Sequence, residues 1–319
     1  MAGNFLLDMM ICRIPALKGK ERINLAEAFD NEDDFSILSK KDISGFLERD
    51  LKGREWTMPE IRKMAEKDVS LTSRLNINFV SWRDNSYPPL LREIYDPPAM
   101  LFYRGTLPDP EKPLVAVVGT RKPSAKAAER AYCLGRELGE AGLPVISGLA
   151  LGIDSMAHRG NMDGHSFTIA VLGSGPDNIY PVSNRDLARR ILETGGLILS
   201  EYPPGTGPLK GNFPARNRII SAMARGTVIV EAPEKSGALI TARFALEHGR
   251  DLWVDKVGVG SSQGAGTKRL VVDGAPLIDS VDTILADWNL AKTEAKIKNE
   301  QDSGADAASV VADYLKIKL

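Results

Sequence analysis

The sequence predicts an α/β protein in which a doubly wound parallel sheet follows a small helical domain. Two observations support this fold class. From Leu114 onward, short apolar runs alternate with helical patterns, and a glycine-containing loop follows each run. Residues 1–70 instead show charged helical patterns without such runs. Apolar strands that alternate with helices are typical of a parallel sheet covered on both faces.

The expected elements of the sheet follow one another in a regular order. The strands are Leu114–Val118, Val145–Ser147, Thr168–Leu172, Leu197–Ser200, Thr227–Glu231 and Leu252–Val254. The helices between them cover about 124–141, 153–162, 184–194, 215–224, 236–248 and 264–273. We therefore expect a Rossmann-like domain over residues 113–283.

The flanking segments differ from this pattern. Residues 1–70 predict a helical N-terminal domain. Residues 71–112 are rich in proline and aromatics, and proline disfavours helix interiors, so we expect an irregular, extended lead-in there. Residues 284–319 predict a linker, richest in charged residues and alanine over 291–305, and a short helix over 307–319.

The bulk composition limits the possible partners and compartments. The chain has 319 residues and a formal net charge of −1, so any polyanion must be held by a local patch. Two distant cysteines, Cys12 and Cys133, form no disulfide framework and fit a reducing cytosol. Asp8 interrupts the first apolar run, which we interpret as a helix rather than a signal peptide. No stretch is long enough for a membrane span, and we expect a cytoplasmic protein without a membrane partner.

A local excess of positive charge follows the fourth expected strand. Between Pro203 and Thr227 there is no acidic residue, but there are four cations, namely Lys210, Arg216, Arg218 and Arg225. A Pro/Gly-rich loop and Phe213 accompany them. Forked guanidiniums and an aromatic ring form a surface suited to phosphates and bases. The alternative is a solvated, cationic helix start, although cations there oppose the helix dipole.

Three other loops also favour anions. Gly119, Thr120, Arg121 and Ser124 precede one helix, Ser147 and Gly148 another, and Ser236 and Gly237 a third. Free amides at a helix N-terminus attract anions, and Arg121 adds a fork for phosphate. Because Arg121 stands where a dinucleotide motif needs its second glycine, we expect no NAD. The alternative for the first loop is a capped turn with a solvated Arg121.

Neither a catalytic set nor a metal site is indicated. Asp154 and His158 are four residues apart on an expected helix, a spacing that could ligate metal, but no third ligand follows at a diagnostic spacing. We therefore favour a structural pair in which His158 bonds to Asp154. No serine stands in a nucleophile elbow. The loops predict binding of an extended polyanion, with no catalytic residue, cofactor or metal.

The motifs from about Tyr87 to Ile278 resemble the DNA-processing protein A family (DprA, also called Smf). The resemblance runs through the following residues: Tyr87–Leu91, Asp96–Pro98, Gly119–Arg121, Ser147–Asp154, Ala157–His158, Tyr180–Pro181 with Asn184, Ser200–Thr206, Phe213–Ile220 and Ser236–Ala242. This ordered series over most of the chain is highly specific.

The resemblance implies a non-enzymatic, sequence-independent binder of single-stranded DNA. Family members protect incoming strands in natural transformation, load the RecA recombinase, and dimerise through the Rossmann-like domain. Arg121 and Lys210 would hold phosphates, and Phe213 would contact a base. The expected DNA-binding residues are Gly119, Thr120, Arg121, Ser124, Ser147, Gly148, Lys210, Phe213, Arg216, Asn217, Arg218, Ser236 and Gly237.

The chain also departs from the family pattern. The expected N-terminal helical module, of the SAM or helix-hairpin-helix kind, is degenerate at Arg13–Gly19, so we expect no DNA contact there. The late glycine-rich loop, Gly258–Gly266, also differs from the family, and too few residues follow 283 for a winged-helix module. The alternative function is a nucleotide hydrolase of the lysine-decarboxylase-like group. It would use Glu231, but Ser236–Ala238 replaces the glycine-rich loop of that group.

Overall fold

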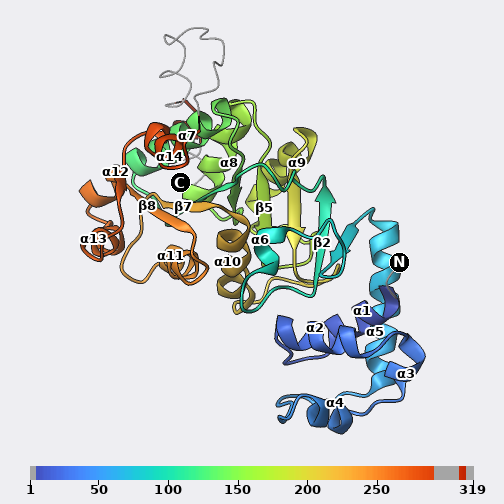
Figure 1. The fold of residues 1–319 in the computed structure, drawn as a ribbon. Coiled ribbons are helices and arrows are strands. Elements are labelled where there is room, and N and C mark those ends of the chain that lie inside the picture. Colours follow the sequence, from blue (N-terminus) through green and yellow to red (C-terminus); the bar gives the residue numbers. More distant parts are fainter. Residues whose placement is uncertain (1–4, 291–308, 314–319) are drawn as a thin grey trace. The chain divides into compact units, whose positions relative to one another are not determined.

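The computed structural model describes residues 5–290 and 309–313, and these form two compact units (Figure 1). Unit 1 comprises Met1–Arg104, Gly173–Asn178 and Leu199–Leu209. Unit 2 comprises Gly105–Leu172, Ile179–Ile198 and Lys210–Leu319. The domain boundaries expected at residues 70, 112 and 283 remain predictions.

Unit 1 is mainly helical at its N-terminal end. Its helices are α1 (Phe5–Arg13), α2 (Gly19–Ala28), α3 (Glu32–Ser36), α4 (Lys40–Phe46), α5 (Met58–Arg74) and α6 (Pro89–Arg92). Asn31 begins α3 by accepting a hydrogen bond from the Asp34 amide at 2.8 Å, as an N-cap residue does. Buried apolar side chains of α1 and α5, among them Met10 and Ile61, belong to one hydrophobic core.

The segment expected to be irregular contains two paired strands. β1 (Asn78–Ser81) runs antiparallel to β2 (Met100–Gly105), with Val80 opposite Leu101. Val80, Leu101 and Phe102 are buried, so these strands are stabilised by apolar burial as well as by their ladder. The irregular character expected for 71–112 is therefore wrong for these strands, because the prolines of this segment lie between the two strands or after the second one, and not within them.

Unit 2 contains the predicted parallel sheet. Its strands are β3 (Val115–Val118), β4 (Val145–Ser147), β5 (Ile169–Leu172), the first half of β6 (Leu197–Ser200), β7 (Gly226–Ile229), β8 (Asp251–Asp255) and β9 (Leu277–Ile278). Their order is β6-β5-β4-β3-β7-β8-β9. β3 pairs in parallel with both β4 and β7, with Val115 opposite Val145 on one side and Gly226 on the other. The doubly wound α/β fold class is confirmed.

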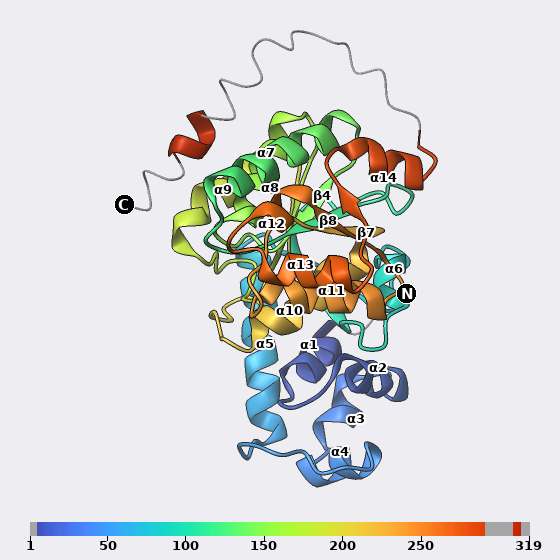
Figure 2. The same ribbon diagram turned by 90° about the vertical axis from the view of Figure 1, so that its left-hand side faces the viewer.

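Helices cover both faces of this sheet. They are α7 (Ala125–Glu140), α8 (Ile153–Asp163), α9 (Arg185–Glu193), α10 (Asn212–Met223), α11 (Gly237–Glu247), α12 (Lys256–Gly260), α13 (Ala265–Val272) and α14 (Val281–Asp287). Figure 2 shows α7, α8 and α14 on one side of the strands and α10 and α11 on the other. Ala127, Ala131, Leu134 and Leu138 form the buried stripe of α7, at the spacing of one helix face.

Two segments near the C-terminal end were expected to be a glycine-rich loop and a linker. Gly258, expected in a glycine-rich loop, lies in the short helix α12, which Asp255 caps by accepting from the Val257 amide at 3.0 Å. The linker over 291–305 lies outside the described residues, whereas residues 309–313 of the expected C-terminal helix are helical. Among the described residues, no helix has the length and hydropathy needed to cross a bilayer.

The strand order creates a switch point between β3 and β7. These strands are adjacent and parallel, but the chain leaves β3 for α7 on one face and β7 for α11 on the other. The two loops therefore diverge and leave a crevice at the carboxyl ends of the strands, where open α/β sheets bind their ligands. The sheet topology thus indicates where a functional site should lie.

Candidate functional site

A cavity of about 770 Å³ lies at this switch point, entirely within unit 2. Residues 119–122 after β3, residues 210–217 at the start of α10 and residues 233–238 before α11 contribute most of its lining. Gly119 of the first segment and Ser236 of the last are 117 positions apart in the sequence. The fold therefore gathers the loops that the sequence singles out separately.

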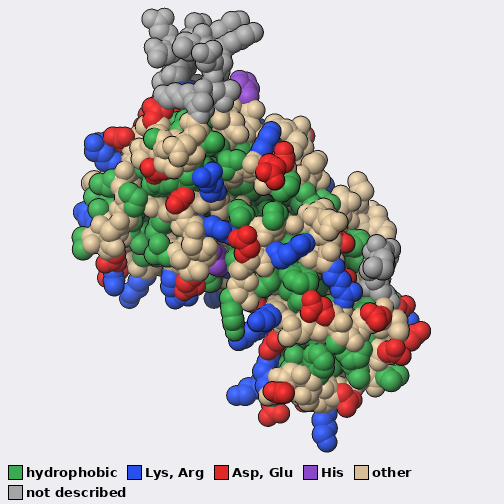
Figure 3. Space-filling model, viewed as in Figure 1, with side chains coloured by type: hydrophobic (Ala, Val, Ile, Leu, Met, Phe, Trp, Pro, Cys, Tyr) green, Lys and Arg blue, Asp and Glu red, His purple; other side chains and the backbone are tan. Residues whose placement is uncertain are grey.

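The cavity carries a local excess of positive charge. Four exposed cations surround it, Arg121, Lys122, Lys210 and Lys235, and we call them the rim. The single carboxylate among the lining residues is Asp154, which is buried. By contrast, Figure 3 shows acidic and basic side chains mixed over the face of the molecule that it presents. The rim is thus the kind of local patch that a polyanion needs on a chain of net charge −1.

Aromatic rings lie beside the rim. Phe213, in the first turn of α10, is half-buried, and its ring centroid lies 5.4 Å from that of Tyr180, at an interplanar angle of 48°. The Arg121 guanidinium carbon lies 5.8 Å from the Phe213 centroid, within cation–π range. Tyr180 is 44% exposed. Cations and rings that share a cavity can hold phosphates and bases together.

Arg216 lies beneath the rim and has different partners. It is only 4% exposed, and its Nη1 donates to the carbonyl oxygens of Gly148, at 3.0 Å, and of Val171. These carbonyls belong to the ends of β4 and β5, so Arg216 joins α10 to the sheet. We call Arg216 and Asp154 the floor of the cavity.

Gly148 explains how the floor is packed. A Cβ at this position would lie 2.5 Å from Nη2 of Arg216 and 2.9 Å from Oδ2 of Asp154. Asp154 accepts hydrogen bonds from the amides of Gly148 and Ala150, at 3.1 and 3.3 Å. Burial raises the pKa of Asp154, and the nearby Arg216 opposes this shift. Gly148 is therefore needed for close packing of the floor, and it does not line the cavity itself.

The expected pair between Asp154 and His158 is not formed. Nδ1 of His158 lies 2.7 Å from the hydroxyl of Thr168, and the imidazole is fully buried. Burial, followed by the charges of Arg216 and Arg159, lowers the pKa of His158 to about 3. The expectation failed because Asp154 is occupied by the amides of its own loop. The described residues contain no cluster of three or more His, Cys, Asp or Glu side chains that could hold a metal ion.

Glu231 anchors the loop that carries Arg121. Its Oε2 accepts from the Ser124 amide at 2.8 Å, and its Oε1 accepts from the Ser124 hydroxyl at 2.9 Å. Ser124 in turn caps α7 by accepting from the Ala127 amide at 3.2 Å. Glu231 is fully buried, and its carboxylate fixes the Ser124 end of the residue 119–124 loop. Its backbone carbonyl accepts from the Thr120 amide at 2.8 Å near the other end.

The remaining expected residues divide between the cavity and the interior. Asn217, Ser236 and Gly237 line the cavity, and the Asn217 side-chain amide donates to the Gly237 carbonyl at 3.3 Å. Ser147 and Arg218 do not line it. Ser147 is buried with its hydroxyl donating to Val117, and Arg218 is 8% exposed.

Several lining residues were not among the expected site residues. Lys122, Lys235, Tyr180 and Gln263 line the cavity beside the predicted set. Lys122 and Lys235 each directly adjoin a predicted residue, so extending the loops by one position would have found them. Gln263 comes from the late glycine-rich loop, and no local signal in the sequence points to it.

The chain matches proteins of one family. Residues 78–289 match the family model of DNA recombination-mediator protein A. The Smf protein of Synechocystis is 40% identical over 260 residues, which are 75% of this chain and 65% of that protein. The chain therefore spans slightly less than two thirds of the length of this relative.

Solved structures agree with this match. The X-ray structure of DNA processing protein A (DprA) from Streptococcus pneumoniae has a TM-score of 0.72 and 34% identity, covering 88% of this chain and 97% of that one. A structure of DNA processing protein A from Helicobacter pylori, concerning its single-stranded DNA binding mode, has a TM-score of 0.58 and 30% identity, covering 67% and 95%. By its matching residues and its fold, the chain belongs to the DNA recombination-mediator protein A family.

Proposed function

We propose that this protein binds single-stranded DNA without sequence preference, in the cavity at the switch point of unit 2. The observation that supports the proposal most strongly is the shared lining: Arg121, Lys210 and Phe213 all face one cavity. The first two are exposed, as phosphate ligands must be, and Phe213 presents part of its ring. The relative from Helicobacter pylori is described as binding single-stranded DNA.

In this proposal the rim and the rings have separate tasks. Arg121 and Lys210 hold consecutive phosphates, with Lys122 and Lys235 adding to the attraction, and a base stacks on Phe213 beside Tyr180. Stacking contributes about 1–3 kcal/mol per base and tolerates any sequence, because every base has a π-face. Duplex DNA should bind less tightly, since its bases are already stacked on one another.

The floor and the glycine loops position these groups. Arg216 fixes the first turns of α10 to the sheet, and Glu231 fixes the loop of Arg121. We infer that Gly119, Thr120, Ser124, Ser147, Gly148 and Arg218 act mainly by shaping the loops, and that Asn217, Ser236 and Gly237 offer polar contacts at the edge of the cavity.

The alternative of a nucleotide hydrolase has less support. It would need the Glu231 carboxylate at the reacting bond, but that carboxylate is buried and accepts two hydrogen bonds from Ser124. We therefore propose a non-enzymatic protein. Incubation with nucleoside monophosphates should release no free base, and release that Glu231→Gln abolishes would overturn this part of the proposal.

A titration with an oligonucleotide tests the binding site. We expect single strands to bind more tightly than duplex, and log Kd to depend linearly on log salt. Lys210→Ala and Arg121→Ala should each weaken binding and flatten the salt slope by about 0.7, the value for one phosphate contact on a single strand.

Matched controls come from the same unit. Lys112 precedes β3, at the opposite end of the strand from the cavity, and Arg189 lies on α9; both are exposed and neither lines the cavity. Lys112→Ala and Arg189→Ala should leave the salt slope close to that of the wild type. Equal slopes for all four variants would show that the rim is not the DNA site.

We also propose that the protein forms a homodimer through unit 2. Leu246, Val272 and Leu277 are 62%, 85% and 45% exposed, and Leu246 helps to line a second cavity of about 430 Å³ near Leu270 and Pro276. Exposed apolar side chains in one region favour protein contacts. Val272→Asp should shift the sedimentation coefficient towards that of a monomer. An unchanged coefficient, whether monomeric or dimeric, would contradict this interface.

The biological role that we propose follows the family. The protein would act in the cytoplasm, protect incoming single strands in natural transformation and load a RecA-type recombinase onto them. Recombinase filament growth on oligonucleotides should accelerate with the wild-type protein and not with Lys210→Ala. Equal acceleration by both proteins would mean that recombinase loading does not depend on Lys210 of the rim.

A further inference from the structure

A tight turn precedes the segment that carries Lys210. The Thr206 amide donates to the Pro203 carbonyl at 3.2 Å, which closes a four-residue turn. Pro204 occupies its second position, and Gly205 occupies its third position with φ at +77°. This is the pattern of a type II turn. Its central peptide group consists of the Pro204 carbonyl and the Gly205 amide, and the orientation of that group distinguishes type II from type I.

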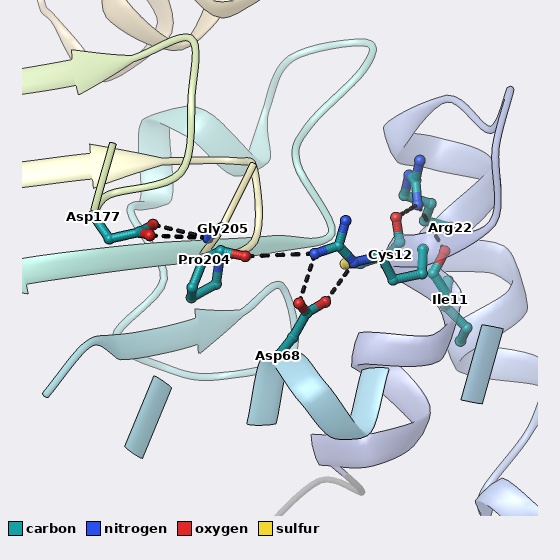
Figure 4. Close-up of polar contacts among 8 residues, drawn as sticks. Ile11, Cys12, Arg22, Asp68, Asp177, Pro204 and Gly205 are labelled. Atoms are coloured by element: carbon teal, nitrogen blue, oxygen red, sulfur yellow. Dashed lines mark hydrogen bonds and ion pairs between the residues drawn. The ribbon is translucent and has the colours of Figure 1, made fainter. Parts of the chain in front are cut away.

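Both ends of this peptide group are held by side chains from distant parts of unit 1. Nη2 of Arg13, at the end of α1, donates to the Pro204 carbonyl at 3.5 Å. The Asp177 carboxylate accepts from the Gly205 amide through both oxygens, at 2.9 and 3.1 Å (Figure 4). A cation at the carbonyl and an anion at the amide match the polarity of the peptide group. Together they favour the type II orientation.

Arg13 is itself held by an ion pair. Its guanidinium binds the Asp68 carboxylate through two bonds, Nη2 to Oδ1 at 2.6 Å and Nε to Oδ2. Asp68 lies on α5 and is 2% exposed, and a bidentate fork of this kind fixes the orientation of the guanidinium. A Cβ on Gly205 would also lie 3.4 Å from Leu71 of α5. The turn is therefore fastened to both α1 and α5.

The chain between the turn and the rim is short. Gly207, Pro208 and Leu209 separate Thr206 from Lys210, and α10 begins two residues later at Asn212. Four residue steps span at most roughly 14 Å, and proline fixes φ at one of them. A change in the turn therefore alters the point from which the chain approaches Lys210.

We propose that Asp177 and Arg13 are positioning residues for DNA binding, acting through the Pro204–Gly205 peptide on Lys210. The inference rests on the proposed function of the rim. It assigns the degenerate N-terminal region a role without DNA contact: α1 and α5 hold the turn, and the turn sets where Lys210 meets a phosphate.

Asp177→Ala tests the proposal because electrostatics and positioning predict opposite results. Asp177 is exposed, and removal of a carboxylate should by charge alone tighten the binding of a polyanion. Positioning predicts weaker binding, by about 3- to 10-fold, and a salt slope flattened towards that of Lys210→Ala, by up to about 0.7. Asp177→Asn keeps an acceptor oxygen for the Gly205 amide and should recover most of the affinity.

Double variants show whether the effect passes through Lys210. In a Lys210→Ala background, Asp177→Ala should cause little further loss, because the contact that it positions is already absent. In an Arg121→Ala background, Asp177→Ala should cause its full loss. Equal losses in both backgrounds would overturn the proposal.

Two neighbouring glycines provide a second, matched test. Gly205 has a positive φ, whereas Gly207 does not, and a Cβ on Gly207 would have nothing within 4 Å. Gly205→Ala should weaken binding about as much as Asp177→Ala, since L-residues rarely adopt the left-handed conformation that this position requires. Gly207→Ala should bind like the wild type. Thermal unfolding of each variant shows that the chain is folded at the temperature of the titration.

The results separate this inference from the proposed function. If the wild type binds single strands and Lys210→Ala weakens it, but Asp177→Ala binds equally or more tightly, the positioning role is wrong and the rim stands. If the wild type does not bind single strands, both proposals fail.

Discussion

Two arginines of the same cavity, Arg121 and Arg216, show how differently one side chain type is used. Arg121 is exposed on the rim and lies over the Phe213 ring. Arg216 is buried in the floor and donates to the ends of two strands. The rim cation can take a ligand at little cost to the fold, whereas the floor cation is part of the fold. Positive charge near a cavity is therefore evidence of a ligand only where it is exposed.

The largest expected effect comes from the floor. Arg216→Met leaves Asp154 buried beside an apolar side chain, and loss of one partner of a buried charge pair costs about 3–5 kcal/mol of unfolding free energy. Arg121→Met should change that free energy by less than about 0.5 kcal/mol. Urea denaturation of both variants measures the difference.

A double variant sharpens this result. Arg216→Met with Asp154→Leu removes both charges, and it should be more stable than Arg216→Met alone, because no buried carboxylate is left without its cation. If Arg216→Met is as stable as the wild type, Arg216 and Asp154 do not stabilise the fold as a pair. The floor and the rim would then not differ in their contribution to stability.

The next largest effect is expected at the ring beside the rim. Phe213→Ala should weaken single-strand binding by about 1–3 kcal/mol, or roughly 5- to 150-fold, with an unchanged salt slope, because stacking releases no counterions. Phe213→Trp should retain binding. Phe244→Ala, on α11 and outside the cavity lining, is the matched control. A flattened slope for Phe213→Ala would mean that the ring acts by positioning Arg121.

The pH dependence of stability gives a smaller effect that concerns the buried imidazole of His158. The pKa of His158 is lowered from its usual 6.5 to about 3. Below pH 6.5 the imidazole therefore binds a proton in the unfolded chain, whereas in the folded chain it stays neutral until the pH approaches 3. The contribution of His158 to stability is therefore complete above pH 6.5 and is lost as the pH falls towards 3.

His158→Gln removes this titration. Between pH 7 and pH 5, the wild type should lose about 2 kcal/mol more unfolding free energy than the variant. Urea denaturation at the two pH values gives both numbers. Parallel losses would show that burial does not hold His158 neutral in the folded chain.

The sequence predicted the sheet better than it predicted the roles of its cations. Strands such as Val115–Val118 are continuous apolar runs in a parallel sheet, so their own residues indicate them. Gly119, Lys210 and Ser236 line one cavity because parallel strands place their carboxyl ends at one edge of the sheet. β1 was missed, because its four residues carry too little periodicity to stand out from a proline-rich segment.

The burial of Arg216 could have been predicted, whereas the partners of His158 could not. Arg216 precedes Ile219 and Ile220 by three and four residues, so it shares the buried face of α10 with them. Thr168 is ten residues from His158 and bonds to it only because α8 packs against the sheet. Helix periodicity shows which residues face inward, but the partner of a buried polar group depends on the packing of separate elements.

The smallest expected effect is at Lys235, a rim residue that sequence reasoning left out of the site. It lines the cavity next to Ser236, which caps α11 by accepting from the Ala238 amide at 3.2 Å. Lys235→Ala should weaken single-strand binding only about 2- to 5-fold and flatten the salt slope by at most about 0.7. The neighbouring Glu234 does not line the cavity, and Glu234→Ala is the matched control. If Lys235→Ala leaves the slope unchanged while Lys210→Ala flattens it, the DNA strand follows the Arg121–Lys210 side of the cavity and the rim is functionally narrower than its exposed charges suggest.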